Sequence, residues 1–298
     1  MENKPITVVT ITYNSSKYIV PLLKTLEVTD NSKFIDKIVI IENNSNEKKL
    51  TIKLIKEYLL VSKLNVKIIS STTNDGFAKS CNRGASYSES KYVLFINPDT
   101  ELHRDSLGLL YRHAEKFNAD IIGGVSEKNE SDVHKTVVRH PNLIIGLFEL
   151  TNLGRLFNID LGRSNFYYDD IKNLYSSKKD IIVDAIGGAY LMVNLNSFQK
   201  IGGFDPGFFM YLEDVDLGVR ANQAGQNIVF CPHSRISHIG GASSNNRHHI
   251  RHQAWFDSRR YYFSKHHSLL INLIIQPIFI VEEYILKARE FFVHNHRQ

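Results

Sequence analysis

The first hundred residues alternate between short apolar runs and amphipathic segments. Short runs rich in β-branched residues predict strands, and apolar positions that recur every three or four residues predict helices. The predicted strands cover residues 6–13, 37–42, 66–70 and 92–97, and the predicted helices cover 18–26, 50–60 and 76–88. Because the strands are apolar on both faces, this alternation predicts an α/β fold in which a mainly parallel sheet lies between helices.

Beyond about residue 125 the periodicity weakens. The segment 125–179 is polar and rich in Asn, and we interpret it as loops and short helices that shape a second substrate site. Regular patterns then return, with strands predicted at 180–186, 189–193, 227–230 and 235–239, and helices at 196–201 and 214–224.

The chain from Ile250 onward is predicted to be helical, and it includes the apolar run Leu269–Val281. This run has 13 positions and contains Asn272, Gln276 and Pro277, so we expect it to be too short and too polar to span a bilayer. Two interpretations stay open. The run is either a core or dimer helix, or an interfacial helix that rests on a membrane.

Composition narrows the class of protein. The chain has 298 residues, of which 43% are hydrophobic and 22% charged, which is typical of a globular protein and excludes a disordered or collagen-like chain. Cys81 and Cys231 lie far apart and belong to no C-x-x-C pair, so we interpret both as core thiols. The N-terminus shows no signal-peptide pattern, and we therefore expect a cytoplasmic protein.

The charge is unevenly distributed. The 36 Lys and Arg residues exceed the 31 Asp and Glu residues by five, and residues 235–265 hold six of these cations with Asp257 as their only acidic residue. A basic tail suits an anionic partner such as a diphosphate, a lipid headgroup or a nucleic acid. We do not expect nucleic acid, because the predicted sheet edge is acidic and rich in amides.

Polar clusters follow three of the predicted strands, at Thr12–Ser15, Glu42–Ser45 and Asn97–Glu101. Ligands of parallel sheets bind beyond the carboxyl ends of the strands, so the three clusters predict one site. The segment Asn74–Gly84 opens a helix with a glycine turn, which would suit a nucleotide or serve only as a helix cap. No G-x-G-x-x-G follows the first strand and no P-loop occurs, so dinucleotide and P-loop sites are not indicated.

Three further segments carry candidate chemistry. Glu213, Asp214 and Asp216 open a predicted helix, where they could act as dipole partners or take a proton from a bound hydroxyl. Asp99 follows Pro98 and could bind a hard cation or form a simple turn. His238, before a glycine pair, is either structural or a nitrogen ligand.

The joint order of these segments resembles family 2 glycosyltransferases, and most closely the bacterial rhamnosyltransferase-like branch that builds surface polysaccharides. The matching motifs span residues 6 to about 243, and they are Thr12-Tyr-Asn14, Glu42-Asn-Asn-Ser45, Asn74-Asp-Gly-Phe-Ala78, Asn82-Arg-Gly84, Asn97-Pro-Asp99, Gly187-Gly-Ala189, Gly202-Gly-Phe-Asp205, Glu213-Asp-Val-Asp-Leu217 and His238. The resemblance implies a GT-A fold, a Rossmann-like sheet between helices. It also implies an inverting hexosyl transfer from a nucleotide-diphosphate sugar, with Mn²⁺ or Mg²⁺ as cofactor.

The resemblance also implies roles for individual residues. Asp214 would be the general base, with Glu213 beside it as a second catalytic residue. Asp99 and His238 would bind the metal. The residues implied to hold the nucleotide sugar are Thr12, Asn14, Glu42, Asn44, Asn74, Gly76, Asn82 and Asn97. Two positions depart from the family pattern, because Glu42 stands where Asp is usual and Asn97 replaces the first carboxylate of the D-x-D element.

On this interpretation residues 1–243 form the catalytic domain, with a nucleotide-sugar half over 1–124 and an acceptor half over 125–243. Residues 244–298 form a helical extension that contacts a membrane or a second copy of the chain. We expect dTDP-L-rhamnose as the donor, UDP-sugars next, and a glycan or lipid-linked glycan as the acceptor at the inner face of the cell membrane. The alternative function is a non-catalytic sugar-nucleotide-binding subunit of a polysaccharide synthase.

Overall fold

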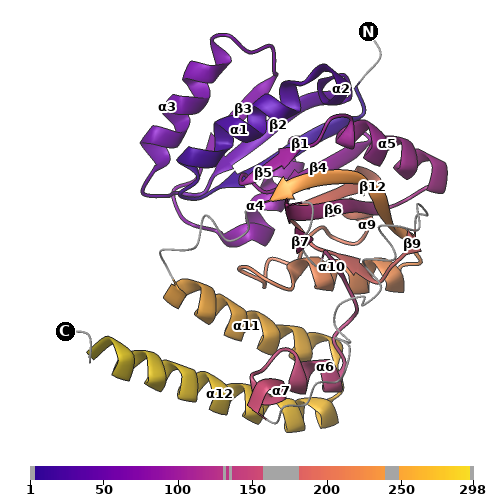
Figure 1. The fold of residues 1–298 in the computed structure, drawn as a ribbon. Helices are drawn as coiled ribbons and strands as arrows, with labels where there is room; N and C mark the ends of the chain where they lie inside the picture. The colour runs from indigo at the N-terminus through magenta and orange to yellow at the C-terminus, as the bar shows by residue number, and fades with distance from the viewer. Residues whose placement is uncertain (1–3, 130–131, 134–135, 157–180, 239–247, 296–298) are drawn as a thin grey trace.

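A parallel half-sheet forms the N-terminal part of the molecule (Figure 1). The computed structural model describes residues 4–129, 132–133, 136–156, 181–238 and 248–295. The four parallel strands are β1 (Ile6–Thr12), β2 (Ile35–Glu42), β3 (Val66–Ser70) and β4 (Tyr92–Ile96). They pair in the order β3-β2-β1-β4, which confirms the four strands predicted from the apolar runs.

The second half of the sheet is mixed. β11 (Tyr190–Asn194) pairs antiparallel with β4 on one side and with β6 (Ile121–Asn129) on the other. β12 (Ile228–His238) runs parallel to β6, and β5 (Thr100–Leu102) closes the edge antiparallel to β12. The shorter strands are β7 (Asp132–Val133), β8 (Val137–Val138), β9 (Ile181–Ile182) and β10 (Ala185–Ile186).

Several predicted boundaries in this half were wrong. β6 runs into the segment 125–179, where no strand was expected. The short helices expected in this segment include α6 (Leu143–Phe148) and α7 (Leu153–Leu156). The strand predicted at 180–186 divides into β9 and β10. The two strands predicted at 227–230 and 235–239 are one strand, β12, whose register shifts between Cys231 and Arg235. Residues 157–180 lie outside the described residues.

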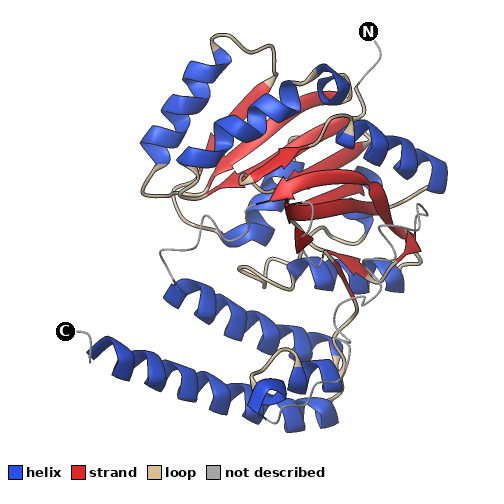
Figure 2. Ribbon diagram, viewed as in Figure 1, coloured by secondary structure: helices blue, strands red, loops and turns tan. Residues whose placement is uncertain are grey.

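Helices cover both faces of the sheet (Figure 2). On one face, α1 (Ser16–Glu27), α3 (Lys48–Leu59) and α5 (Ser106–Phe117), with the short α2 (Thr29–Ser32), enclose one hydrophobic cluster. On the other face, α4 (Gly76–Ala85), α9 (Leu195–Lys200) and α10 (Glu213–Gln223) enclose a second cluster. The apolar stripe of α1 is fully buried, as helical spacing predicts. Cys81 and Cys231 are buried free thiols, one in each cluster, as expected.

The C-terminal segment is helical, as predicted, and it forms a hairpin. α11 (His248–His266) and α12 (Leu269–Asn295) lie side by side, and α6 packs against α12 near the hairpin turn (Figure 1). Phe263 of α11 and Phe279 of α12 meet edge to face at 5.4 Å. Both rings are fully buried in the same hydrophobic cluster as Ile145 of α6, so the hairpin shares a core with the body of the molecule.

Candidate active site

The polar clusters after β1, β2 and β4 lie at one edge of the sheet, as predicted. A cavity of about 300 Å³ opens there, and its lining draws on all three strand ends, on α4, on the loop before α10 and on the first turn of α11. Six of the predicted site residues line this cavity: Asn74, Gly76, Asn97, Asp99, Glu213 and Asp214. His238 lies next to this lining, because its Nε2 is 3.3 Å from Asp99 Oδ1.

Other predicted nucleotide-binding residues lie outside the lining and make contacts of their own. The buried Glu42 carboxylate accepts hydrogen bonds from the N–H groups of Asn44 and Ser45, at 3.1 and 3.0 Å, and so closes its own loop. The hydroxyl of Thr12, also buried, donates to the carbonyl of Ile41.

The remaining two predicted residues lie just after β1 and within α4. Asn14 adopts a left-handed conformation with φ 51°, and its Oδ1 is buried without a hydrogen-bond partner among the described residues. The Asn82 amide exchanges two hydrogen bonds with the backbone of Phe204 and so anchors the Gly202–Asp205 loop to α4.

Asn43 connects the loops around the cavity, and the sequence analysis missed it. Its Nδ2 donates to Asn74 Oδ1 at 2.8 Å and to the carbonyl of Gly76 at 3.2 Å, while its Oδ1 accepts from the N–H of Asp75 at 3.1 Å. This residue therefore joins the end of β2 to the turn that opens α4. Its place between two polar residues at a strand end was the one signal that could have identified it.

The backbone at position 76 requires a glycine. Its φ is +77°, and a Cβ there would lie 2.3 Å from the carbonyl oxygen of Phe209. The same carbonyl accepts a hydrogen bond from the N–H of Phe77 at 2.7 Å. The glycine thus lets the loop before α10 close directly over the N-terminus of α4.

Two residues with strained backbones directly precede the catalytic candidates Glu213 and Asp214. Tyr211 and Leu212 have φ values of 75° and 63°, a conformation that costs a non-glycine residue about 1–3 kcal/mol and that often occurs at functional sites. They precede Glu213 and Asp214 directly, at the start of α10. The N–H of Gly188 then donates to Asp214 Oδ2 at 2.8 Å and fixes the carboxylate at the cavity wall.

Burial raises the pKa of both carboxyl groups. For Asp214 the hydrogen bonds from the Gly188 and Val215 N–H groups oppose this rise without cancelling it. For Glu213 burial raises the pKa further, and the neighbouring charge of Asp214 adds to it. Glu213 Oε2 is also buried without a hydrogen-bond partner among the described residues. A carboxyl with a raised pKa is a stronger base once ionised, which suits proton transfer.

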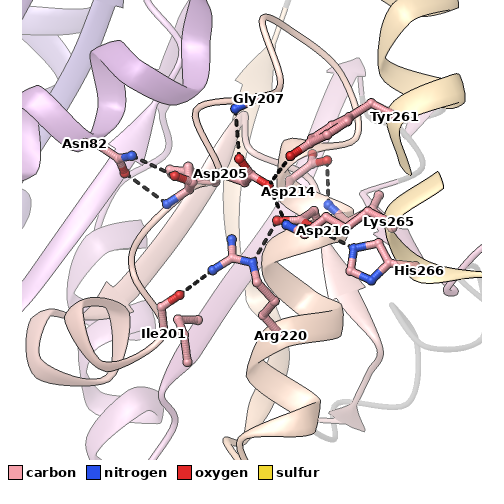
Figure 3. A network of polar contacts seen from close by, with 12 residues as sticks. Asn82, Ile201, Asp205, Gly207, Asp214, Asp216, Arg220, Tyr261, Lys265 and His266 are labelled. Atoms are coloured by element: carbon pink, nitrogen blue, oxygen red, sulfur yellow. Dashed lines mark hydrogen bonds and ion pairs between the residues drawn. The ribbon is translucent and has the colours of Figure 1, made fainter. Parts of the chain in front are cut away.

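Asp216 has a different environment from its two acidic neighbours (Figure 3). It is fully buried and pairs with Arg220 at 2.8 Å and with Lys265 at 2.6 Å, and His266 Nε2 lies 2.7 Å from its Oδ1. Burial would raise the pKa of Asp216, but the hydrogen bonds from His266 and Lys265 and the charge of Arg220 hold it below its ordinary value. Since Lys265 and His266 belong to α11, Asp216 connects α10 to the C-terminal hairpin.

α11 reaches the cavity itself, which the sequence did not reveal. Ile250 and Arg251 in its N-terminal part line the cavity, and Arg251 Nε donates to the Tyr211 hydroxyl at 3.3 Å. Further along, Ser258 Oγ donates to the carbonyl of Met210 at 2.8 Å, and Lys265 pairs with Asp205 at 2.5 Å. The hairpin therefore holds the whole loop that carries Tyr211.

Asp99 and His238 offer an oxygen and a nitrogen to a divalent cation. Both side chains are largely buried, Asn97 Nδ2 lies 3.4 Å from His238 Nε2, and Ser126 Oγ lies 3.3 Å from the other ring nitrogen, Nδ1. A mixed oxygen and imidazole donor set fits Mn²⁺, and a second contact on the ring is typical of a metal-binding histidine. Among the described residues no third His, Cys, Asp or Glu joins them. The pair thus fits a cation that shares its coordination with a substrate.

Comparisons with known proteins agree with this geometry. The family model "Glycosyl transferase family 2" matches residues 7–185. The rhamnosyltransferase WbbL of Escherichia coli K12 is 26% identical over 166 residues, which cover 53% of this chain and 58% of WbbL. The N-acetylglucosaminyl-diphospho-decaprenol L-rhamnosyltransferase of Mycobacterium tuberculosis H37Rv is 28% identical over 148 residues, covering 49% of this chain and 46% of that protein.

A solved structure has the same fold. The crystal structure of GalNAc-T7 with UDP, GalNAc and Mn²⁺ superposes with a TM-score of 0.59 at 15% identity, over 80% of this chain and 44% of that one. The matches span about half the length of the curated relatives. Because the family model covers more than half of the residues, the chain belongs to glycosyl transferase family 2, and its fold is the GT-A type expected from the motifs.

Proposed function

We propose that this chain is an inverting, metal-dependent glycosyltransferase that moves a sugar from a nucleotide-diphosphate donor to a glycan acceptor. The two curated relatives are rhamnosyltransferases, which supports dTDP-L-rhamnose as the first donor to test, with UDP-sugars next. The M. tuberculosis relative takes its name from a diphospho-decaprenol acceptor, which supports a lipid-linked glycan as the acceptor.

One observation carries the proposal. A single cavity brings together Asp214, a half-buried carboxylate with a raised pKa, and Asp99, whose oxygen lies 3.3 Å from the imidazole of His238. Asp214 supplies a base, while Asp99 and His238 supply the donor atoms for a cation beside a diphosphate. A binding module has no need of a strained loop that positions a base in the same cavity.

The proposed reaction uses the residues as follows. Asp214 takes the proton from the acceptor hydroxyl, and that oxygen forms a bond to the anomeric carbon of the donor sugar. The bond between this carbon and the diphosphate oxygen breaks, and the nucleoside diphosphate leaves from the opposite face, so the configuration inverts. Glu213, whose Oε2 is unpaired among the described residues, is placed to hydrogen bond to a sugar hydroxyl.

Asp99 and His238 would hold the cation, which when bound would offset the charge of the departing diphosphate. Arg251 adds a fixed positive charge to the lining of the same cavity. Asn74, Asn97 and the backbone at Gly76 would hold the nucleotide, since they line the cavity on the side of the parallel strands. The roles of Thr12, Asn14, Glu42, Asn44 and Asn82 would be to hold the loops that bear these groups.

Asp214→Asn tests the assignment of the base. General base catalysis contributes about 10²- to 10⁴-fold, so we expect transfer and slow donor hydrolysis to fall by that factor. Nucleotide binding should stay unchanged, because the substitution keeps the size of the side chain. The matched control is Asp257→Asn, at an exposed carboxylate of α11. Wild-type turnover in the Asp214→Asn protein would refute the proposed base.

A further inference from the structure

α12 carries a continuous apolar face that is largely exposed in the described part of the chain. Ten positions spaced as one side of a helix are all uncharged, and eight of them are large side chains between 39% and 74% exposed. We name these ten the outer face of α12: Leu269, Leu270, Leu273, Ile274, Pro277, Ile280, Val281, Tyr284, Ile285 and Ala288. In Figure 1, α11 lies between α12 and the sheet. An apolar surface of this extent marks a site of interaction.

The opposite face of α12 is fixed to α11. Ile275 and Phe279 are fully buried there, and the buried Arg259 guanidinium pairs with Glu282 at 2.5 Å and donates to the carbonyl of Phe279. Glu283 pairs with Arg260 at 3.0 Å. Both carboxylates of α12 whose side chains are described therefore turn inward and are neutralised. The outer face carries no negative charge.

The helix is long enough to raise the question of whether it spans a bilayer. The stretch Leu269–Arg289 has the length and composition of a membrane span, unlike the shorter run considered from the sequence, and only 17% of its most apolar window is buried. Spanning would carry Glu282 and Glu283 into hydrocarbon and break their ion pairs with α11, which is costly. Gln276 would likewise lose its hydrogen bond to the carbonyl of Arg260. The contacts thus favour a helix that lies flat against a surface.

The charges at the C-terminal end favour a lipid surface over a second copy of the chain. Helical spacing puts Lys287 and Arg289 on opposite edges of the outer face. The Lys287 side chain pairs with Glu283 at 2.6 Å and is still 39% exposed. Long cationic side chains that flank an apolar face can reach anionic headgroups while their stems stay in the interface. A second copy would bring only the same uncharged face and the same cations.

We propose that the outer face of α12 lies in the interface of an anionic lipid bilayer, with the helix axis parallel to the membrane. The binding would also hold the catalytic cavity close to the membrane, since α11 contributes Ile250 and Arg251 to that cavity. Membrane contact does not depend on the proposed reaction.

Sedimentation with lipid vesicles tests this proposal without any substrate. The full chain should bind vesicles that contain phosphatidylglycerol more tightly than vesicles of phosphatidylcholine alone, and added salt should weaken the binding. Leu273→Ser with Ile285→Ser should bind about 100-fold more weakly, since each change removes roughly 1.5 kcal/mol of apolar burial. Both side chains are exposed, at 64% and 61%, so the double variant should unfold at the wild-type temperature.

The matched control is Leu60→Ser with Ile182→Ser, which removes one exposed leucine and one exposed isoleucine elsewhere on the molecule. This control should bind vesicles as the wild type does. Two results would overturn the proposal. One is equal vesicle binding by the wild type and the Leu273/Ile285 variant. The other is a vesicle-free dimer that the same variant abolishes, which would make the outer face an interface between copies.

Discussion

Three acidic residues lie in the first turn of α10, and the electrostatic environment of the third differs from that of the first two. Glu213 is buried and Asp214 is half-buried beside it, and both have raised pKa values, whereas the hydrogen bonds from His266 and Lys265 and the charge of Arg220 lower the pKa of Asp216. In the sequence the three carboxylates look equivalent, and each could be a dipole partner of the helix. Only the contacts distinguish the proposed catalytic pair from Asp216, because these contacts come from the loop at Gly188 and from α11.

Glu213→Gln should stabilise the protein at alkaline pH. The folded state holds the Glu213 proton more tightly than the unfolded state, so its stabilising contribution is complete at low pH and is lost as the pH rises through the raised pKa. The substitution removes this loss. We expect the free energy of unfolding at pH 8 to rise by about 1 to 3 kcal/mol relative to wild type, and the difference to shrink by pH 5. Denaturant unfolding at the two pH values measures both quantities.

Asp216→Asn should have the opposite effect and lower the free energy of unfolding. It removes the charge of the buried carboxylate that Arg220, Lys265 and His266 share, and breaking a buried ion pair typically costs about 3–5 kcal/mol at neutral pH. The contribution of Asp216 is present above its unfolded pKa and is lost as the pH falls through its lowered pKa. If both variants lost stability to the same degree at pH 5 and pH 8, the contrast drawn between these carboxylates would be wrong.

At the level of elements, α11 contacts both the loop before α10 and α10 itself (Figure 3). Lys265 pairs with Asp205 in the loop and with Asp216 in the helix, and Tyr261 donates to Asp205 at 3.0 Å. Asp214 lies between these two anchoring points in the chain. Its position therefore depends on a helix that the sequence places outside the family motifs.

Lys265→Met should slow turnover while leaving nucleotide binding intact. A small displacement of a catalytic group can reduce the rate by up to about 100-fold, and we expect a loss of roughly 10- to 100-fold in kcat. The proposed nucleotide side of the cavity draws on the end of β4 and on α4, whereas Lys265 pairs with Asp205 and Asp216. Lys265→Arg should recover part of the activity, and Lys53→Met, at an exposed lysine that pairs with Glu57 in α3, is the control. Parallel losses in nucleotide affinity and kcat would contradict a positioning role.

At the scale of the whole molecule, the sequence predicted the parallel half of the sheet because each apolar run there is short and ends in a polar cluster. It missed β6, since Gly123 and Gly124 weaken the strand pattern. Both glycines are needed, because a Cβ at either would lie 2.3 Å from Ile186 Cγ2 or the carbonyl oxygen of Ser234. Pro232 similarly interrupted the pattern of β12, at the point where its register shifts.

The site residues, like the strands, could be predicted only where a local pattern marks them. Asn97, Asp99 and Asp214 were predictable, because each stands at the end of a strand or the start of a helix. Arg251 and the ties of Asp216 to α11 were not, because they join segments about 40 to 50 residues apart in the chain. No local pattern records such contacts.

The central claim is that the cavity binds a nucleotide-diphosphate sugar together with a divalent cation. The most direct test is the thermal stabilisation of the wild type and of Asp99→Asn by a panel of nucleoside diphosphates and their sugars, each with Mn²⁺ and with chelator. Bound ligand raises the stability of the native state. We predict a rise in Tm for one nucleoside that requires Mn²⁺ and disappears in Asp99→Asn. A wild-type Tm that no nucleotide raises, with or without Mn²⁺, would contradict the claim.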